Sequence, residues 1–125
     1  MKLFYYKAKV IDVYDGDTCT CLVDLGFKIS IKVKCRLIGI DTPEIRTKDL
    51  VEKKAGYNTR DWLRERILNK EVLLHTKEKG KFGRWLGTIW SYEEQEPSFE
   101  NSYNKQMINE GLAKEYWGGK KQWNH

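Results

Sequence analysis

The nine residues from Arg36 to Glu44 bring together one cation, two carboxylates and a turn stiffened by proline. Arg36 ends a run that alternates like a β-strand, and Asp41, Thr42 and Glu44 follow around Pro43. Carboxylate and backbone carbonyl oxygens are the ligands that calcium prefers. Arginine binds phosphate oxygens through a planar fork of N–H donors and keeps its charge. The stretch therefore contains the parts of a site for a metal ion and a phosphate, although by itself it is more often a surface loop with an Asx-type turn before Pro43.

Roles within this stretch follow from the order of its residues. Asp41 can offer its carboxylate to an ion, and Thr42 can offer its backbone carbonyl. Glu44 comes two residues after these expected ligands. A carboxylate at that place can orient a water molecule beside the ion, or accept its proton, without binding the ion. We interpret Glu44 as the residue that handles an attacking water.

A second cluster is the turn formed by Asp15, Gly16, Asp17 and Thr18. Glycine in such a turn can take a positive φ, and the two carboxylates that flank it can point to one side and meet a hard cation. An ordinary β-hairpin turn is the alternative interpretation, and it is the more common one for these four residues taken alone.

The third cluster is Lys81, Phe82, Gly83 and Arg84. Gly83 permits a tight turn, so that Arg84 projects from the end of a hairpin. It is either an ordinary exposed arginine or a second guanidinium aimed at the same phosphate. Together the three clusters contain an ion site, a water activator and two cations for the charge that grows on phosphoryl oxygens. Those are the parts of metal-assisted phosphodiester hydrolysis.

The elements that must position these residues are mainly strands. Residues 28–37 alternate almost strictly between apolar and polar, with Arg36 on the cationic side of the run. A strand of this kind places a side chain more accurately than a loop does. The residue patterns predict strands at 7–14, 18–25, 28–37, 71–77 and 85–90, helices at 55–68 and 104–114, and an exposed, mobile loop at 45–54.

This order predicts an α+β fold that is mainly β, a five-stranded OB-fold barrel with two helices packed against it. We expect one OB-fold domain over residues 1–125, with a tail from about residue 118.

Composition limits the classes of partner. The net charge of +5 and the isoelectric point near 9.0 favour an anionic partner. No apolar run is long enough for a membrane helix. The apolar run near the N-terminus is too short to be the hydrophobic region of an export signal. Cys19, Cys21 and Cys35 are expected to be free thiols, since His75 and His125 lie too far along the chain to suggest a zinc site. We therefore expect a cytoplasmic protein that does not contact membranes and is a monomer.

Taken in order, the motifs resemble the staphylococcal nuclease (thermonuclease) family, in a short intracellular or phage- or plasmid-borne form. The resemblance rests on Asp15 to Thr18, Arg36 to Glu44, Lys81 to Arg84, and Asn104 with Gly111, Leu112, Ala113 and Lys114. It implies an OB-fold nuclease that uses one calcium ion to hydrolyse DNA or RNA, with little sequence specificity, and leaves 3′-phosphate ends.

The same resemblance implies a role for each matching residue. Asp17 and Asp41 would bind calcium through their carboxylates and Thr42 through its backbone carbonyl, while Asp15 would support the ion through water. Glu44 would be the general base, Arg36 and Arg84 would bind the phosphate, and Asn104 and Gly111 would be structural. Lys81, Phe82, Tyr116 and Trp117 would contact the substrate, with Phe82 standing where the family often has a tyrosine.

Two other functions remain open at this point. A nucleic-acid-binding OB module without catalysis would be expected to lack Glu44, Arg36 or Arg84, and all three are present. A calcium-stabilised structural domain would leave the two arginines unexplained.

Overall fold

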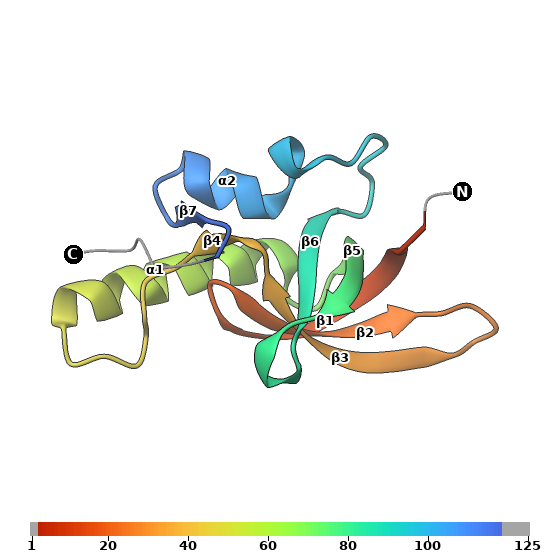
Figure 1. The fold of residues 1–125 in the computed structure, drawn as a ribbon, viewed down its shortest axis with the longest axis horizontal. Helices are drawn as coiled ribbons and strands as arrows, with labels where there is room; N and C mark the ends of the chain where they lie inside the picture. The colour runs from red at the N-terminus through yellow and green to blue at the C-terminus, as the bar shows by residue number, and fades with distance from the viewer. Residues whose placement is uncertain (1–2, 119–125) are drawn as a thin grey trace.

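Five strands close into a barrel in the computed structural model, which describes residues 3–118 (Figure 1). Their order around the barrel is β1-β2-β3-β6-β5, in which β3 and β6 are parallel and every other neighbouring pair is antiparallel. This confirms the predicted five-stranded barrel. The bounds are Tyr5–Asp15 for β1, Thr18–Asp24 for β2, Ser30–Leu37 for β3, Glu71–Lys79 for β5 and Trp85–Ser91 for β6.

The remaining elements lie outside the barrel strands, and the two helices cover one end and one side of the barrel (Figure 1). They are β4 at Gly39–Asp41, α1 at Leu50–Ile67, the 3-10 turns η1 at Lys81–Gly83 and η2 at Phe99–Asn101, α2 at Tyr103–Asn109, and β7 at Lys114–Tyr116. Strands β4 and β7 pair antiparallel as a small separate sheet. Sequence patterns did not predict these two strands, because three residues are too few to show an alternation.

The core lies inside the barrel and beneath the two helices. Barrel side chains such as Val10, Cys21 and Leu74 are fully buried, and Leu63 of α1 and Met107 of α2 pack against them. Burial of each large apolar side chain stabilises the fold by about 1.5–3 kcal/mol. The three cysteines are buried in this core as free thiols, as expected. Within residues 3–118, no helix is both long and apolar enough to span a membrane.

The first half of the third predicted strand differs from expectation. The alternation places Ile29 and Ile31 on the buried face, but both are about half exposed. The β2–β3 hairpin extends past the other strands (Figure 1), so burial begins only at Val33, which is partly buried against the core, and is complete at Cys35 and Leu37. The prediction of the strand was right, and the burial of its outer half was wrong.

Helix α1 begins five residues earlier than predicted. Asp49 caps it by accepting hydrogen bonds from Val51 N (2.9 Å) and Glu52 N (3.0 Å). The expected loop at 45–54 therefore ends at Asp49. Leu50 and Val51 in the first turn are exposed, so the apolar stripe does not extend to the start of the helix. The sequence signal for this helix start was an aspartate three residues before a glutamate.

Helix α2 is shorter than predicted. It ends at Asn109, Glu110 caps it, and Gly111 follows with φ +74°. Glycine accepts this left-handed conformation readily, which is how many helices end. The chain then turns so that Lys114 begins β7. The predicted tail lies outside the described residues from position 119 onwards.

Candidate active site

The β1–β2 turn presents Asp17 on a rigid loop. Asp15 Oδ1 accepts a hydrogen bond from Asp17 N (3.0 Å), and Asp17 Oδ1 accepts one from the Thr18 hydroxyl (3.0 Å). A Cβ atom on Gly16 would lie 2.5 Å from the Thr59 methyl of α1 and 3.0 Å from the Thr42 methyl. The turn is therefore pressed against both, and only glycine fits there.

Asp17 joins two of the predicted clusters. Its Oδ2 accepts a hydrogen bond from the Thr42 hydroxyl (3.0 Å) and lies 3.4 Å from Nη2 of Arg36. The side chains of Asp17 and Arg36 are mostly buried. The β1–β2 turn and the stretch from Arg36 to Glu44 thus form one site, as their residue types predict.

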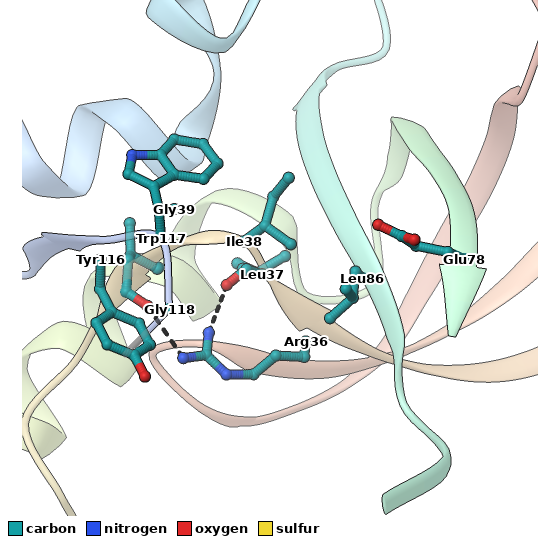
Figure 2. Close-up of a pocket in the computed structure, with 10 residues that line it drawn as sticks. Arg36, Leu37, Ile38, Gly39, Glu78, Leu86, Tyr116, Trp117 and Gly118 are labelled. Atoms are coloured by element: carbon teal, nitrogen blue, oxygen red, sulfur yellow. Dashed lines mark hydrogen bonds between the residues drawn. The ribbon is translucent and has the colours of Figure 1, made fainter. Parts of the chain in front are cut away.

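Arg36 is held by backbone oxygens as well as by Asp17. Its Nη2 donates to Ile40 O (3.0 Å) and its Nη1 donates to Leu37 O. These contacts fix the guanidinium beside the turn between β3 and β4 (Figure 2). A fixed guanidinium loses less freedom when it binds an anion than a mobile one does.

Asp41 and Thr42 are buried at the end of β4. Asp41 is opposite Lys114 in the pairing of β4 with β7. Asn104 of α2 supports the backbone of the stretch from Arg36 to Glu44, because its Nδ2 donates to Ile38 O (2.9 Å) and Gly87 O (3.1 Å). Asn104 is therefore structural, as expected, and the pairing with the short strand β7 holds the backbone at Asp41.

Arg84 approaches the same turn from the β5–β6 side. Its Nη1 lies 3.4 Å from the Thr18 hydroxyl, and its guanidinium carbon is 5.7 Å from the ring of Phe82. Its Nε is buried and has no hydrogen-bond acceptor within the described part of the chain. Burying a donor without an acceptor costs free energy, and an anionic oxygen at this place would remove the cost. Arg36 and Arg84 therefore contact adjacent residues, Asp17 and Thr18.

Glu44 is exposed at the edge of the site, and α1 positions its backbone. Glu44 N donates to Oε2 of Glu52 (3.0 Å). A Cβ atom on Gly56 would lie 2.9 Å from Pro43 O and 3.0 Å from Glu44 O. Sequence reasoning missed Glu52 and Gly56, because Glu52 fell in the expected loop and the close approach at Gly56 is a tertiary contact.

The donor atoms fit a hard cation. Asp17, Asp41 and the Thr42 carbonyl offer only oxygen, which suits calcium, with water to complete the coordination shell. In residues 3–118 no group of three or more histidine, cysteine, aspartate and glutamate side chains is placed to hold a metal. The expected site would therefore bind the ion through only two carboxylates. Burial, and then the neighbouring carboxylate of Asp17, raise the pKa of Asp15 to about 7. This crowding of acidic groups is what a bound cation relieves.

A hollow of about 400 Å³ opens beside Arg36 (Figure 2). Tyr116 and Trp117, both predicted to contact substrate, line it from the end of β7. The Tyr116 ring lies next to the Arg36 guanidinium, while Trp117 extends toward Gly39 (Figure 2) and packs on Phe99 with the ring centroids 5.0 Å apart. Sequence patterns did not distinguish the two, and Tyr116 is the ring beside Arg36, the arginine expected to bind phosphate.

Lys81 and Phe82, the other predicted substrate contacts, lie in η1 and are exposed. They are on the Arg84 side of the site, whereas Tyr116 and Trp117 are on the Arg36 side. The predicted substrate contacts therefore form two groups, one beside each arginine.

Comparisons with known proteins agree with this geometry. The model of a family described as staphylococcal nuclease homologue matches residues 34–125. A protein named ParB from Escherichia coli is 31% identical over 112 residues, which are 88% of this chain and 57% of the relative. A thermonuclease from Staphylococcus hyicus is 34% identical over 109 residues, 86% of this chain and 54% of the relative. An uncharacterized endonuclease from Haemophilus influenzae is 30% identical over 117 residues, 94% of this chain and 54% of the relative. The chain thus spans a little more than half the length of these relatives.

Proposed function

The chain belongs to the staphylococcal nuclease family, and from that membership and the site geometry we propose that it is a metal-assisted nuclease. Its substrate is DNA or RNA, and it hydrolyses phosphodiester bonds with little sequence specificity. The observation that carries the proposal is the pair of arginines that approach adjacent residues of one acidic turn, Arg36 at Asp17 and Arg84 at Thr18. Two cations converging on two carboxylates are arranged for an ion and a phosphate bound side by side.

Calcium, when bound by Asp17, Asp41 and the Thr42 carbonyl, would supply positive charge that polarises the phosphate and a nearby water, with Asp15 supporting it through water. Glu44 orients that water and accepts its proton as the water oxygen attacks phosphorus. The bond from phosphorus to the 5′ oxygen breaks, the 5′ oxygen takes a proton from solvent water and leaves as a hydroxyl group, and the phosphate stays on the 3′ oxygen. Arg36 and Arg84 donate hydrogen bonds to the phosphoryl oxygens as their negative charge grows.

Substrate binding depends on the same contacts between the arginines and the phosphate. Arginine recognition of phosphate does not depend on the base, so cleavage shows little sequence preference. Lys81 adds a further cation near Arg84, and Tyr116 is the ring on which a base stacks beside Arg36, next to Trp117. We keep the expectation of a monomer in the cytoplasm as a prediction.

Cleavage of plasmid and single-stranded DNA, first with calcium and then with a chelator, tests the proposal. We expect cleavage that requires the ion, yields 3′-phosphate ends and is lost in Glu44→Gln. The matched control is Glu65→Gln, an exposed glutamate at the far end of α1. Cleavage that survives the chelator, or full activity in Glu44→Gln, would remove this mechanism.

DNA binding without cleavage in any divalent ion would identify a binding module instead. Because the contacts are to phosphates, binding should weaken steeply with salt. Binding that is unchanged between low and physiological salt would contradict recognition of the phosphate backbone.

A further inference from the structure

A second hollow, of about 370 Å³, lies on the outer face of the barrel on the other side of Arg84. Tyr14, Thr20, Lys34, Phe82 and Arg84 line it, together with Asp12, Asp15 and Thr18. Arg84, Asp15 and Thr18 belong to the candidate active site, so the hollow is continuous with that site. The roles proposed above leave Tyr14, Thr20, Lys34 and Asp12 without a function.

The floor of this hollow is a row across three strands. Asp12 of β1 is opposite Thr20 of β2, and Thr20 is opposite Lys34 of β3. In the same register Thr18 is opposite Arg36. Because alternate residues of a strand share a face, Lys34 follows Arg36 on one surface at a step of about 6.6 Å. Successive phosphates of an extended single strand are separated by a step of the same order.

Two exposed aromatic rings from distant parts of the chain stand at this hollow. Tyr14 is 51% exposed and Phe82 is 89% exposed. Phe82 has φ +62°, a left-handed conformation that is unfavourable for a bulky residue. This backbone conformation places the Phe82 ring in solvent beside Arg84. Exposed aromatic rings next to a phosphate-binding cation are the usual platform for unpaired bases.

Each of the two arginines that approach the acidic turn lines a different hollow. Arg36 lines the hollow of Tyr116, and Arg84 lines the hollow of Tyr14. Both arginines approach the turn at Asp17 and Thr18, so a phosphate between them has one hollow on either side.

We propose that the hollow of Tyr14, Phe82 and Lys34 is a second nucleotide subsite. It takes the nucleotide on the side of the scissile phosphate opposite the Tyr116 hollow. The base stacks on Tyr14 and Phe82, and Lys34 pairs with the next phosphate. Asp12 accepts hydrogen bonds from base amino groups, since its charge excludes phosphate. The assignment rests on the proposed function for the position of the scissile phosphate.

The test compares a long substrate with a short one. The long substrate is a single-stranded DNA oligonucleotide, and the short one is a mononucleotide methyl diester in which a methyl group replaces the second nucleoside. Tyr14→Ala should lower kcat/KM for the oligonucleotide about tenfold or more, the effect of losing one stacked base, and leave the diester unchanged. Tyr14→Phe should keep the wild-type value. Tyr92→Ala is the matched control, because Tyr92 is 47% exposed and lines none of the described hollows.

Binding separates failure of this inference from failure of the proposed function. Fluorescence anisotropy of labelled single-stranded DNA, measured in a chelator, needs no cleavage. Lys34→Ala should reduce the slope of log affinity against log salt concentration by about 0.7, the value for one lost phosphate contact on a single strand. Lys70→Ala, at the end of α1, should leave the slope unchanged.

The outcomes are distinct. Suppose that the wild type shows no cleavage, while Tyr14→Ala and Lys34→Ala each weaken oligonucleotide binding. The subsite then stands and the nuclease proposal falls. If neither variant changes oligonucleotide binding, the subsite falls whatever the cleavage assay gives. An equal loss on the long and the short substrate for Tyr14→Ala would also overturn it, because that pattern indicates damage to the active site.

Discussion

The two arginines of the site are held in different ways. Arg36 has backbone and carboxylate partners for its guanidinium, whereas Arg84 meets only the Thr18 hydroxyl at 3.4 Å and keeps a buried Nε without an acceptor in the described residues. An unsatisfied buried donor gains more from an incoming phosphate oxygen than one that already has an acceptor. Arg84 is therefore the side chain whose bonding changes most when substrate binds.

Replacement of Arg84 tests this reading. Arg84→Ala should lower kcat by about 10²–10³-fold, the usual loss for one preorganised donor to a developing anion. Arg84→Lys should recover only part of it, since an ammonium lacks the planar fork. Single-turnover cleavage of DNA measures both variants, and Arg60→Ala, a partly buried arginine of α1 paired with Asp61, is the control. Wild-type activity in Arg84→Lys would contradict a role for the Nε donor.

Residue types and spacing predict the charged members of the site, because a metal and a phosphate restrict the choice of side chain. They do not predict the supporting residues. Glu52, Gly56 and Thr59 act through contacts with segments outside their own helix, such as Glu52 with Glu44 N and Thr59 Oγ1 donating to Leu112 O (2.8 Å). Nothing in a local pattern distinguishes these residues from ordinary members of an amphipathic helix.

At the scale of elements, the strands of the barrel could be predicted because each alternates over several residues. The small sheet of β4 and β7 could not, although it positions Asp41. The start of α1 was also missed, because its first turn depends on the Asp49 cap and on exposed residues. The site thus depends most on elements that are too short, or too polar, to show a period.

The contact between α1 and the loop that contains Glu44 decides whether Gly56→Ala raises or lowers the free energy of unfolding. In an exposed helix interior, Gly→Ala stabilises by about 1 kcal/mol. At Gly56 the added methyl would lie 2.9 Å from Pro43 O, so Gly56→Ala should lower the free energy of unfolding and displace Glu44. We expect reduced kcat with little change in oligonucleotide binding. Urea unfolding and steady-state cleavage measure the two effects. Asn58→Ala, at an exposed position of the same helix, is the control and should be neutral or stabilising.

Helix α2 is joined to the site through one buried amide. Asn104 is fully buried, donates to Ile38 O and Gly87 O, and accepts from Ile89 N (3.2 Å). Asn104→Ala removes these three hydrogen bonds; Gly87 O keeps the one from Ile38 N (3.0 Å), and each buried backbone group that loses its partner costs about 1–3 kcal/mol. We expect the free energy of unfolding to fall by at least 2 kcal/mol, roughly, in urea titrations. A cost below about 0.5 kcal/mol, comparable to an ordinary surface change, would contradict this account.

For the molecule as a whole, the candidate ion site is assembled from the β1–β2 turn and the end of β4, segments more than twenty residues apart. The unfolded chain does not bring Asp17 and Asp41 together, so an ion bound at both stabilises only the folded state. Calcium should therefore raise the midpoint of thermal unfolding, by an amount equivalent to about 2.7 kcal/mol when its concentration is a hundred times the dissociation constant.

Scanning calorimetry with calcium and with a chelator measures this shift without any substrate. Asp41→Asn should lose the shift, because an amide oxygen carries no charge for the ion. Asp61→Asn, an exposed aspartate of α1, should keep it. Because each variant is compared with itself in the two solutions, a lower starting stability does not affect the result. An equal calcium shift in Asp41→Asn and in the wild type would place the ion elsewhere on the molecule and leave the two arginines beside an acidic turn that binds no metal.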